Sequence, residues 1–70
     1  MLVKKITYNI KNIRLEKGIT LRQLEKMSGI SNGFISAIEN NKQHPTLITL
    51  IQIADALEVD VTELFTICSL

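Results

Sequence analysis

Cys68 and His44 are the only cysteine and the only histidine in this 70-residue chain. A lone cysteine forms no internal disulfide bond, and one Cys with one His is too small a ligand set for a zinc site. The sequence shows no nucleophile–base pair, no carboxylate dyad and no glycine-rich phosphate loop. These residues therefore predict neither an enzyme nor a site for a metal or a cofactor.

The charged residues are divided unevenly along the chain. The net charge is only +1, but residues 1–42 hold all eight Lys and Arg and three of the seven acidic residues, a net of +5. Residues 43–70 hold the other four acidic residues and no Lys or Arg, a net of −4. This asymmetry predicts one face that suits a polyanion and a second face with a different role.

Length and composition favour one small folded domain over residues 1–70. The chain is 46% apolar and 21% charged, which is typical of a globular protein. No apolar run approaches the roughly 18 residues of a membrane span. The first six residues lack the long apolar core of a signal peptide. We therefore expect a cytoplasmic protein whose surplus of apolar residues suits a partner subunit.

Capping residues and apolar spacing predict an all-α fold. Helices are expected at residues 7–17, 21–28, 32–40, 47–57 and 61–65. The N-cap residues of the last four are expected to be Thr20, Ser31, Thr46 and Asp60. Thr20 with Gln23, and Asp60 with Glu63, have the spacing of a capping box. Because these local signals agree with one another, they favour helices throughout the chain.

The junction between the second and third expected helices is the most informative part of the sequence. Gly29 ends one helix, and only Ile30 separates it from the cap at Ser31. So short a connection forces the two helices to cross sharply, as in a helix-turn-helix, whose second helix can enter a DNA major groove. Helical corners of this size also occur in proteins that bind no DNA, so spacing alone leaves both interpretations open.

The stretch from Ile10 to Phe65 resembles the phage-repressor type of helix-turn-helix domain, the lambda-repressor-like (Cro/XRE-type) family. The matching residues are in register without a gap: Ile13-Arg14, Lys17-Gly18-Ile19-Thr20, Leu24, Gly29-Ile30-Ser31, Ile35-Ser36, Ile38-Glu39-Asn40, Lys42, Pro45-Thr46, Leu50, Ile53-Ala54, Ala56-Leu57 and Leu64-Phe65. The resemblance implies a five-helix repressor fold in which residues 32–40 form the recognition helix, usually within a two-fold dimer.

Four positions depart from the family pattern, one of them Glu58, which stands where Gly is usual at the end of the fourth helix. Leu21 stands where the family often has a DNA-contacting Gln, and Glu25 stands where a small residue is usual. We expect Glu25 either to extend its carboxylate to solvent or to pair with a neighbouring cation, Arg22 or Lys26. Asn41 replaces the usual Gly after the third helix, and Asn tolerates the left-handed conformation that this position requires.

The resemblance also implies roles for the residues around the recognition helix. Contacts with base edges are expected from Ser31, Asn32, Gly33, Phe34 and Ala37. Asn32 is the expected main reader, because Asn can pair bidentately with adenine. Phe34 is equally suited to packing on the second helix. Phosphate contacts are expected from Arg22, Gln23, Ser36, Asn40, Asn41 and Lys42. Arg14 and Glu39 match a structural ion pair that orients this helix.

Apolar residues beyond the expected core predict a dimer. The expected contacts are Ile48, Ile53, Phe65, Ile67 and Leu70, with the tail 66–70 included. The sequence as a whole therefore predicts a homodimeric transcriptional regulator, a repressor, that binds a palindromic operator in double-stranded DNA. Two alternatives stay open. One is an antitoxin that also binds a toxin protein, and the other is a protein-interaction module that has lost DNA binding. An anti-repressor is a further candidate protein partner.

Overall fold

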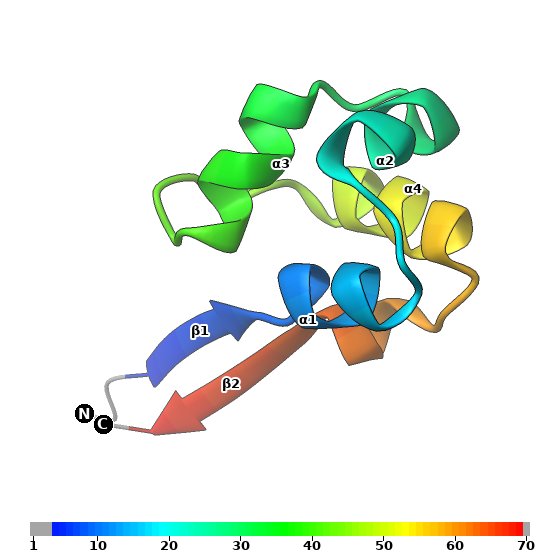
Figure 1. The fold of residues 1–70 in the computed structure, drawn as a ribbon. Helices are drawn as coiled ribbons and strands as arrows, with labels where there is room; N and C mark the ends of the chain where they lie inside the picture. The colour runs from blue at the N-terminus through cyan, green and yellow to red at the C-terminus, as the bar shows by residue number, and fades with distance from the viewer. Residues whose placement is uncertain (1–3, 70) are drawn as a thin grey trace.

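The computed structural model describes residues 4–69, and its elements follow one another along the chain. They are β1 (Lys4–Tyr8), α1 (Ile10–Glu16), α2 (Leu21–Ser28), α3 (Asn32–Glu39), α4 (Leu47–Leu57), the 3-10 turn η1 (Val61–Leu64) and β2 (Phe65–Ser69). The helices pack into one body, and the two strands form a ribbon that projects from it (Figure 1). The molecule consequently measures 41 × 20 × 20 Å. Within residues 4–69, no helix has the length and apolar character needed to cross a membrane.

The expected all-α, five-helix fold is wrong, because β1 and β2 pair as a two-stranded antiparallel sheet. The helix expected at 7–17 begins only at Ile10, and its first residues belong to β1. The helix expected at 61–65 is a 3-10 turn, and Phe65 already starts β2. The tail 66–70 was expected only as a dimer contact, and its residues 66–69 form most of β2. Leu70 lies outside the described residues.

Residue type explains why these two ends form strands. Each contains β-branched and aromatic residues, which favour an extended backbone. The register places Ile6 opposite Ile67 and Tyr8 opposite Phe65. Directly opposed residues lie on the same face of a sheet, so these four form one apolar face of the ribbon.

Asn9 fixes the ribbon to the helical body. Its backbone N–H donates to the carbonyl of Leu64 at 2.7 Å. Its side-chain Nδ2 donates to the carbonyl of Glu63 and to Thr66 Oγ1, both at 3.2 Å. Asn9 therefore ends β1 and holds it against the start of β2.

The predicted α2 and α4 have the expected bounds, and α3 ends one residue earlier than expected, at Glu39. Their caps explain the agreement. Thr20 Oγ1 accepts from the backbone N–H of Gln23 at 3.1 Å, and Gln23 Oε1 accepts from that of Thr20 at 2.8 Å. Thr46 caps α4 in the simpler way, accepting from the N–H of Thr49. These bonds satisfy donors that the first turn of a helix leaves free.

The core lies between the helices and η1. Its buried apolar residues are Ile10, Leu24, Ile35, Ile38, Leu50, Ile53, Ala54, Leu57 and Leu64. Ile53, predicted to contact a partner subunit, is 0% exposed. That prediction is wrong, because Ile53 lies three residues after Leu50 and therefore shares the inner face of α4.

The Asp60 cap makes the stability of this fold depend on pH. Asp60 Oδ1 accepts from the backbone N–H of Thr62 at 2.9 Å and from its hydroxyl at 2.7 Å. These bonds hold the pKa of the Asp60 carboxyl below its ordinary value of 3.8. Because the folded-state pKa is the lower one, the stabilisation is present above the ordinary value and is lost as the pH falls through the lowered one.

We expect Asp60→Asn, which still accepts a hydrogen bond but does not titrate, to be less stable than the parent at neutral pH. The difference should shrink in acid, as measured by urea unfolding at neutral pH and again well below the ordinary carboxyl pKa. Asp55→Asn, at an exposed position on α4, is the control for general charge. An equal difference between parent and Asp60→Asn at both pH values would contradict the assignment.

Candidate nucleic-acid interface

The turn between α2 and α3 fixes how the two helices cross. Gly29 adopts a left-handed conformation with φ of 77°, which glycine reaches without a steric penalty. The hydroxyl of Ser28 donates to the carbonyl of Leu24 at 2.7 Å and accepts from the N–H of Ile30 at 3.1 Å. Ser31 then caps α3. The turn therefore holds α3 across α2 at the surface of the body (Figure 1).

The five predicted base contacts all lie in the cap or the first two turns of α3, where their surroundings differ. The hydroxyl of Ser31 accepts from the N–H of Phe34 at 3.2 Å and so serves as the cap. Gly33 is exposed, whereas Asn32 and Ala37 are half-buried. Phe34 packs against the core cluster, which accounts for its partial burial. The exposed start of this surface is therefore formed by Ser31 and Gly33, with the half-buried Asn32 between them.

Glu25 joins α2 to the first residue of α3, a contact that the sequence did not predict. Its Oε2 accepts from the backbone N–H of Asn32 at 3.2 Å, and its Oε1 accepts from Asn32 Nδ2 at 3.1 Å. The expected pairing of Glu25 with Arg22 or Lys26 does not appear among the ion pairs of residues 4–69. The physical reason is that the free N–H groups and dipole at a helix N-terminus attract a carboxylate. The available signal was the position of Glu25 in the last turn of α2, seven residues before the first residue of α3.

The predicted phosphate contacts lie on both sides of this surface. Arg22 and Gln23 are exposed in the first turn of α2, and Lys42 is exposed after α3. Ser36 is half-buried, and its backbone carbonyl accepts a hydrogen bond from Asn40 Nδ2 at 2.8 Å. Gln23 Oε1 accepts a hydrogen bond in the capping box of α2, so Nε2 is the side-chain group that remains to donate to a phosphate.

Asn41 has a structural role in addition to its predicted one. It adopts the left-handed conformation expected from the sequence, with φ of 57°. Its N–H donates to the carbonyl of Ile38, and that of Lys42 donates to the carbonyl of Ala37, which is the bonding pattern of a Schellman motif. Asn41 Nδ2 donates to the carbonyl of Ile6 in β1 at 3.2 Å. The loop after α3 is thus tied to the ribbon.

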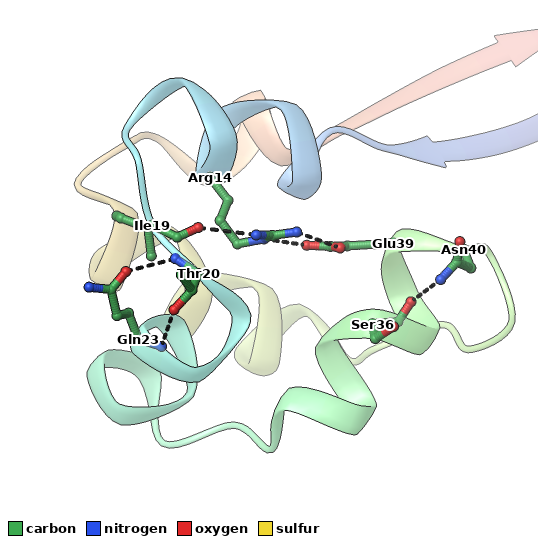
Figure 2. A network of polar contacts seen from close by, with 7 residues as sticks. All are labelled: Arg14, Ile19, Thr20, Gln23, Ser36, Glu39 and Asn40. Atoms are coloured by element: carbon green, nitrogen blue, oxygen red, sulfur yellow. Dashed lines mark hydrogen bonds and ion pairs between the residues drawn. The ribbon is translucent and has the colours of Figure 1, made fainter.

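Arg14 and Glu39 form a bidentate ion pair between α1 and the end of α3 (Figure 2). Arg14 Nε donates to Glu39 Oε2 at 2.9 Å, and Nη2 donates to Oε1 at 3.2 Å. Arg14 Nη1 donates to the carbonyl of Ile19 at 3.1 Å. The two side chains are only 8% and 4% exposed. Such a pair holds α3 in place and leaves neither charge available to DNA.

Gly33 provides a test of how closely DNA approaches α3. Apart from its chain neighbours and the backbone of its own helix, no atom of the described residues lies within 4 Å of a Cβ built at this residue, so Gly33→Ala fits the free protein. We expect it to raise the free energy of unfolding by about 0.5–1 kcal/mol, because alanine loses less backbone entropy on folding. If the DNA backbone comes close here, the added methyl group lowers DNA affinity at the same time. Thermal melts and binding titrations check both. A variant with raised stability and unchanged affinity would contradict a close approach.

Comparisons with known proteins agree with this geometry. Residues 10–64 match the helix-turn-helix family model. An uncharacterized HTH-type transcriptional regulator from Sinorhizobium fredii is 40% identical over 63 residues, which span 90% of this chain and 82% of that protein.

Solved structures give the same relationship. A candidate DNA-binding protein from Bacteroides fragilis superposes with a TM-score of 0.80 at 34% identity, covering 89% of this chain and all of that one. The wild-type restriction-modification controller protein C.Esp1396I superposes with a TM-score of 0.69 at 43% identity, covering 73% of this chain and 66% of that one. This chain therefore belongs to the Cro/XRE-type helix-turn-helix family of DNA-binding transcriptional regulators.

Proposed function

We propose that this regulator is a homodimeric repressor that binds a palindromic operator in the cytoplasm, with α3 in the major groove of each half-site. The observation that carries the proposal is the exposed start of α3, held across α2 by the turn at Gly29. In this arrangement Asn32 is the main base reader, and Ser31, Gly33, Phe34 and Ala37 lie close to the base edges. Binding an operator requires no chemical step, so no enzymatic activity is proposed.

Phosphate contacts would hold the reading helix in register. The proposed contacts are Arg22, Gln23, Ser36, Asn40, Asn41 and Lys42. An open pocket of about 400 Å³ lies between β1 and the loop after α3, and it is lined by Lys4, Lys5, Ile6, Asn41 and His44. Its two lysines add to the positive charge near the loop after α3. This distribution supports binding to a polyanion along the side of the molecule that carries α3.

A mobility-shift titration on random-sequence duplex tests DNA binding itself. At low salt we expect a shift whose affinity falls steeply as salt is added, because the contacts with phosphates release counterions. A chain that binds no duplex at any salt concentration would instead be a protein-interaction module.

The dimer is proposed to form through the exposed apolar residues of α4 and β2. Ile48 is 72% exposed and Ile67 is 57% exposed, whereas Phe65 is half-buried. Leu70, the other predicted contact, lies outside the described residues. A two-fold contact here would cover apolar surface and set the two copies of α3 about 34 Å apart, one turn of duplex.

We expect Ile67→Asp and Ile48→Asp each to raise the dimer dissociation constant at least about tenfold, because they place an unpaired charge in an apolar contact. Sedimentation measures the association directly. Leu15→Asp is the matched control, since Leu15 is 57% exposed on α1 and lies outside the proposed interface. Equal effects of all three variants, or a parent chain that is monomeric at tens of micromolar, roughly where standard interfaces persist, would contradict the proposed dimer.

A further inference from the structure

The contact between Glu25 and Asn32 spans the turn of the helix-turn-helix. Glu25 lies in the second turn of α2, and Asn32 is the first residue of α3. Both side chains are half-buried. One carboxylate oxygen accepts from the Asn32 backbone and the other accepts from its side-chain amide, at 3.2 and 3.1 Å. The carboxylate therefore holds both the helix start and the side chain that it presents.

This contact fixes which end of the Asn32 amide points outward. An ionised carboxylate only accepts hydrogen bonds, so it can face the NH₂ group of Asn32 but not Oδ1. Oδ1 is consequently turned away from Glu25, and within residues 4–69 no side chain donates to it. Nδ2 also keeps a second N–H that Glu25 does not use.

We propose that Glu25 is a positioning residue that sets the base preference of this regulator through Asn32. With its amide held in this orientation, Asn32 presents an acceptor together with one remaining donor. Adenine matches this pair in the major groove, because it offers the N6 amino group as donor and N7 as acceptor. Guanine offers only acceptors on that edge and would face Oδ1 unfavourably. The inference rests on the proposed function, in which the start of α3 reads bases.

Glu25→Gln tests this inference with almost no change in shape. A Gln at this position can accept from the backbone N–H of Asn32 and donate to Asn32 Oδ1, so the Asn32 amide is free to turn its NH₂ group outward. We expect the preference for adenine over guanine at the base pair read by Asn32 to fall by about tenfold. Competition binding on duplexes that carry each of the four bases measures the preference.

Two comparisons separate positioning from other effects. Glu16→Gln removes the same charge from an exposed position on α1, so it can change overall affinity but should leave the base preference intact. In an Asn32→Ala background, Glu25→Gln should change the base preference no further, because its effect passes through Asn32. An effect of equal size in that background would overturn the inference.

Nuclear magnetic resonance of the free protein tests the orientation of the Asn32 amide without DNA. We expect the side-chain NH₂ resonances of Asn32 in the free protein to shift in Glu25→Gln but not in Glu16→Gln, and unshifted resonances would overturn the inference. If Asn32→Ala relaxes the preference while Glu25→Gln retains it, the inference fails and the proposed function stands. If Asn32→Ala leaves every preference unchanged, the assignment of Asn32 as base reader fails, and the inference fails with it.

Discussion

Arg14→Ala is expected to lower the free energy of unfolding by about 3–5 kcal/mol, because it leaves the carboxylate of Glu39 buried without its partner. The carbonyl of Ile19 loses its Arg14 donor in the same variant. Small domains are stable by only about 5–15 kcal/mol, so this is a large share of the total. Urea unfolding followed by circular dichroism measures the change. Lys11→Ala, at an exposed position on the same helix, should change stability by less than about 0.5 kcal/mol.

A double-mutant cycle shows whether the two charges act as a pair. Glu39→Ala alone strands the Arg14 guanidinium and should cost about as much as Arg14→Ala. The double variant strands neither charge, so it should cost clearly less than the sum of the two single variants. Strictly additive costs would show that the two residues stabilise the fold independently, contrary to the geometry in Figure 2.

Asn32→Ala is expected to weaken operator binding by about 1–3 kcal/mol per half-site and to relax the preference at one base pair. The reason is that alanine keeps α3 helical but presents neither the donor nor the acceptor of the amide. Titrations with duplexes that carry each base at that position measure both effects. Lys42→Ala is a useful contrast, since loss of a phosphate contact should weaken binding to all sequences alike. A uniform loss in Asn32→Ala would place Asn32 among the backbone contacts.

The helices around the turn could be predicted because their signals are local. Thr20 and Gln23, three residues apart, form the capping box that starts α2, and Gly29 adopts the left-handed conformation that ends it. Ser31 and Thr46 likewise accept from N–H groups three residues ahead. Such contacts depend on a few neighbouring residues, so spacing in the sequence is enough to reveal them.

The ribbon could not be predicted in the same way, because its strands lie at opposite ends of the chain. Ile6 pairs with Ile67, and no turn between them marks a hairpin. Each strand has only five residues, and an isolated pair of strands is marginal in water. The bonds of Asn9 to Glu63 and Thr66, which stabilise the pairing, also join residues far apart in the sequence.

In the candidate site, separation along the chain did not decide which contacts could be predicted. The Arg14–Glu39 pair was implied by the family resemblance, although 25 residues separate its members. The pairing of Glu25 with Asn32 was missed because nearby cations on its own helix offered simpler partners. Arg22 and Lys26 are closer to Glu25 in the sequence than Asn32 is. The sharp turn at Gly29 nevertheless brings Asn32, at the start of α3, within hydrogen-bonding reach of Glu25 on α2.

The start of α3 is proposed to read bases in a two-fold symmetric operator. Selection of bound sites from a random duplex pool, with the parent chain and with Asn32→Ala, tests it most directly. We expect an inverted repeat whose half-sites lie about 10–10.5 base pairs apart, with the preference at one base pair per half-site lost in the variant. A pool with no enriched sequence, or the same enriched sequence for both proteins, would contradict it.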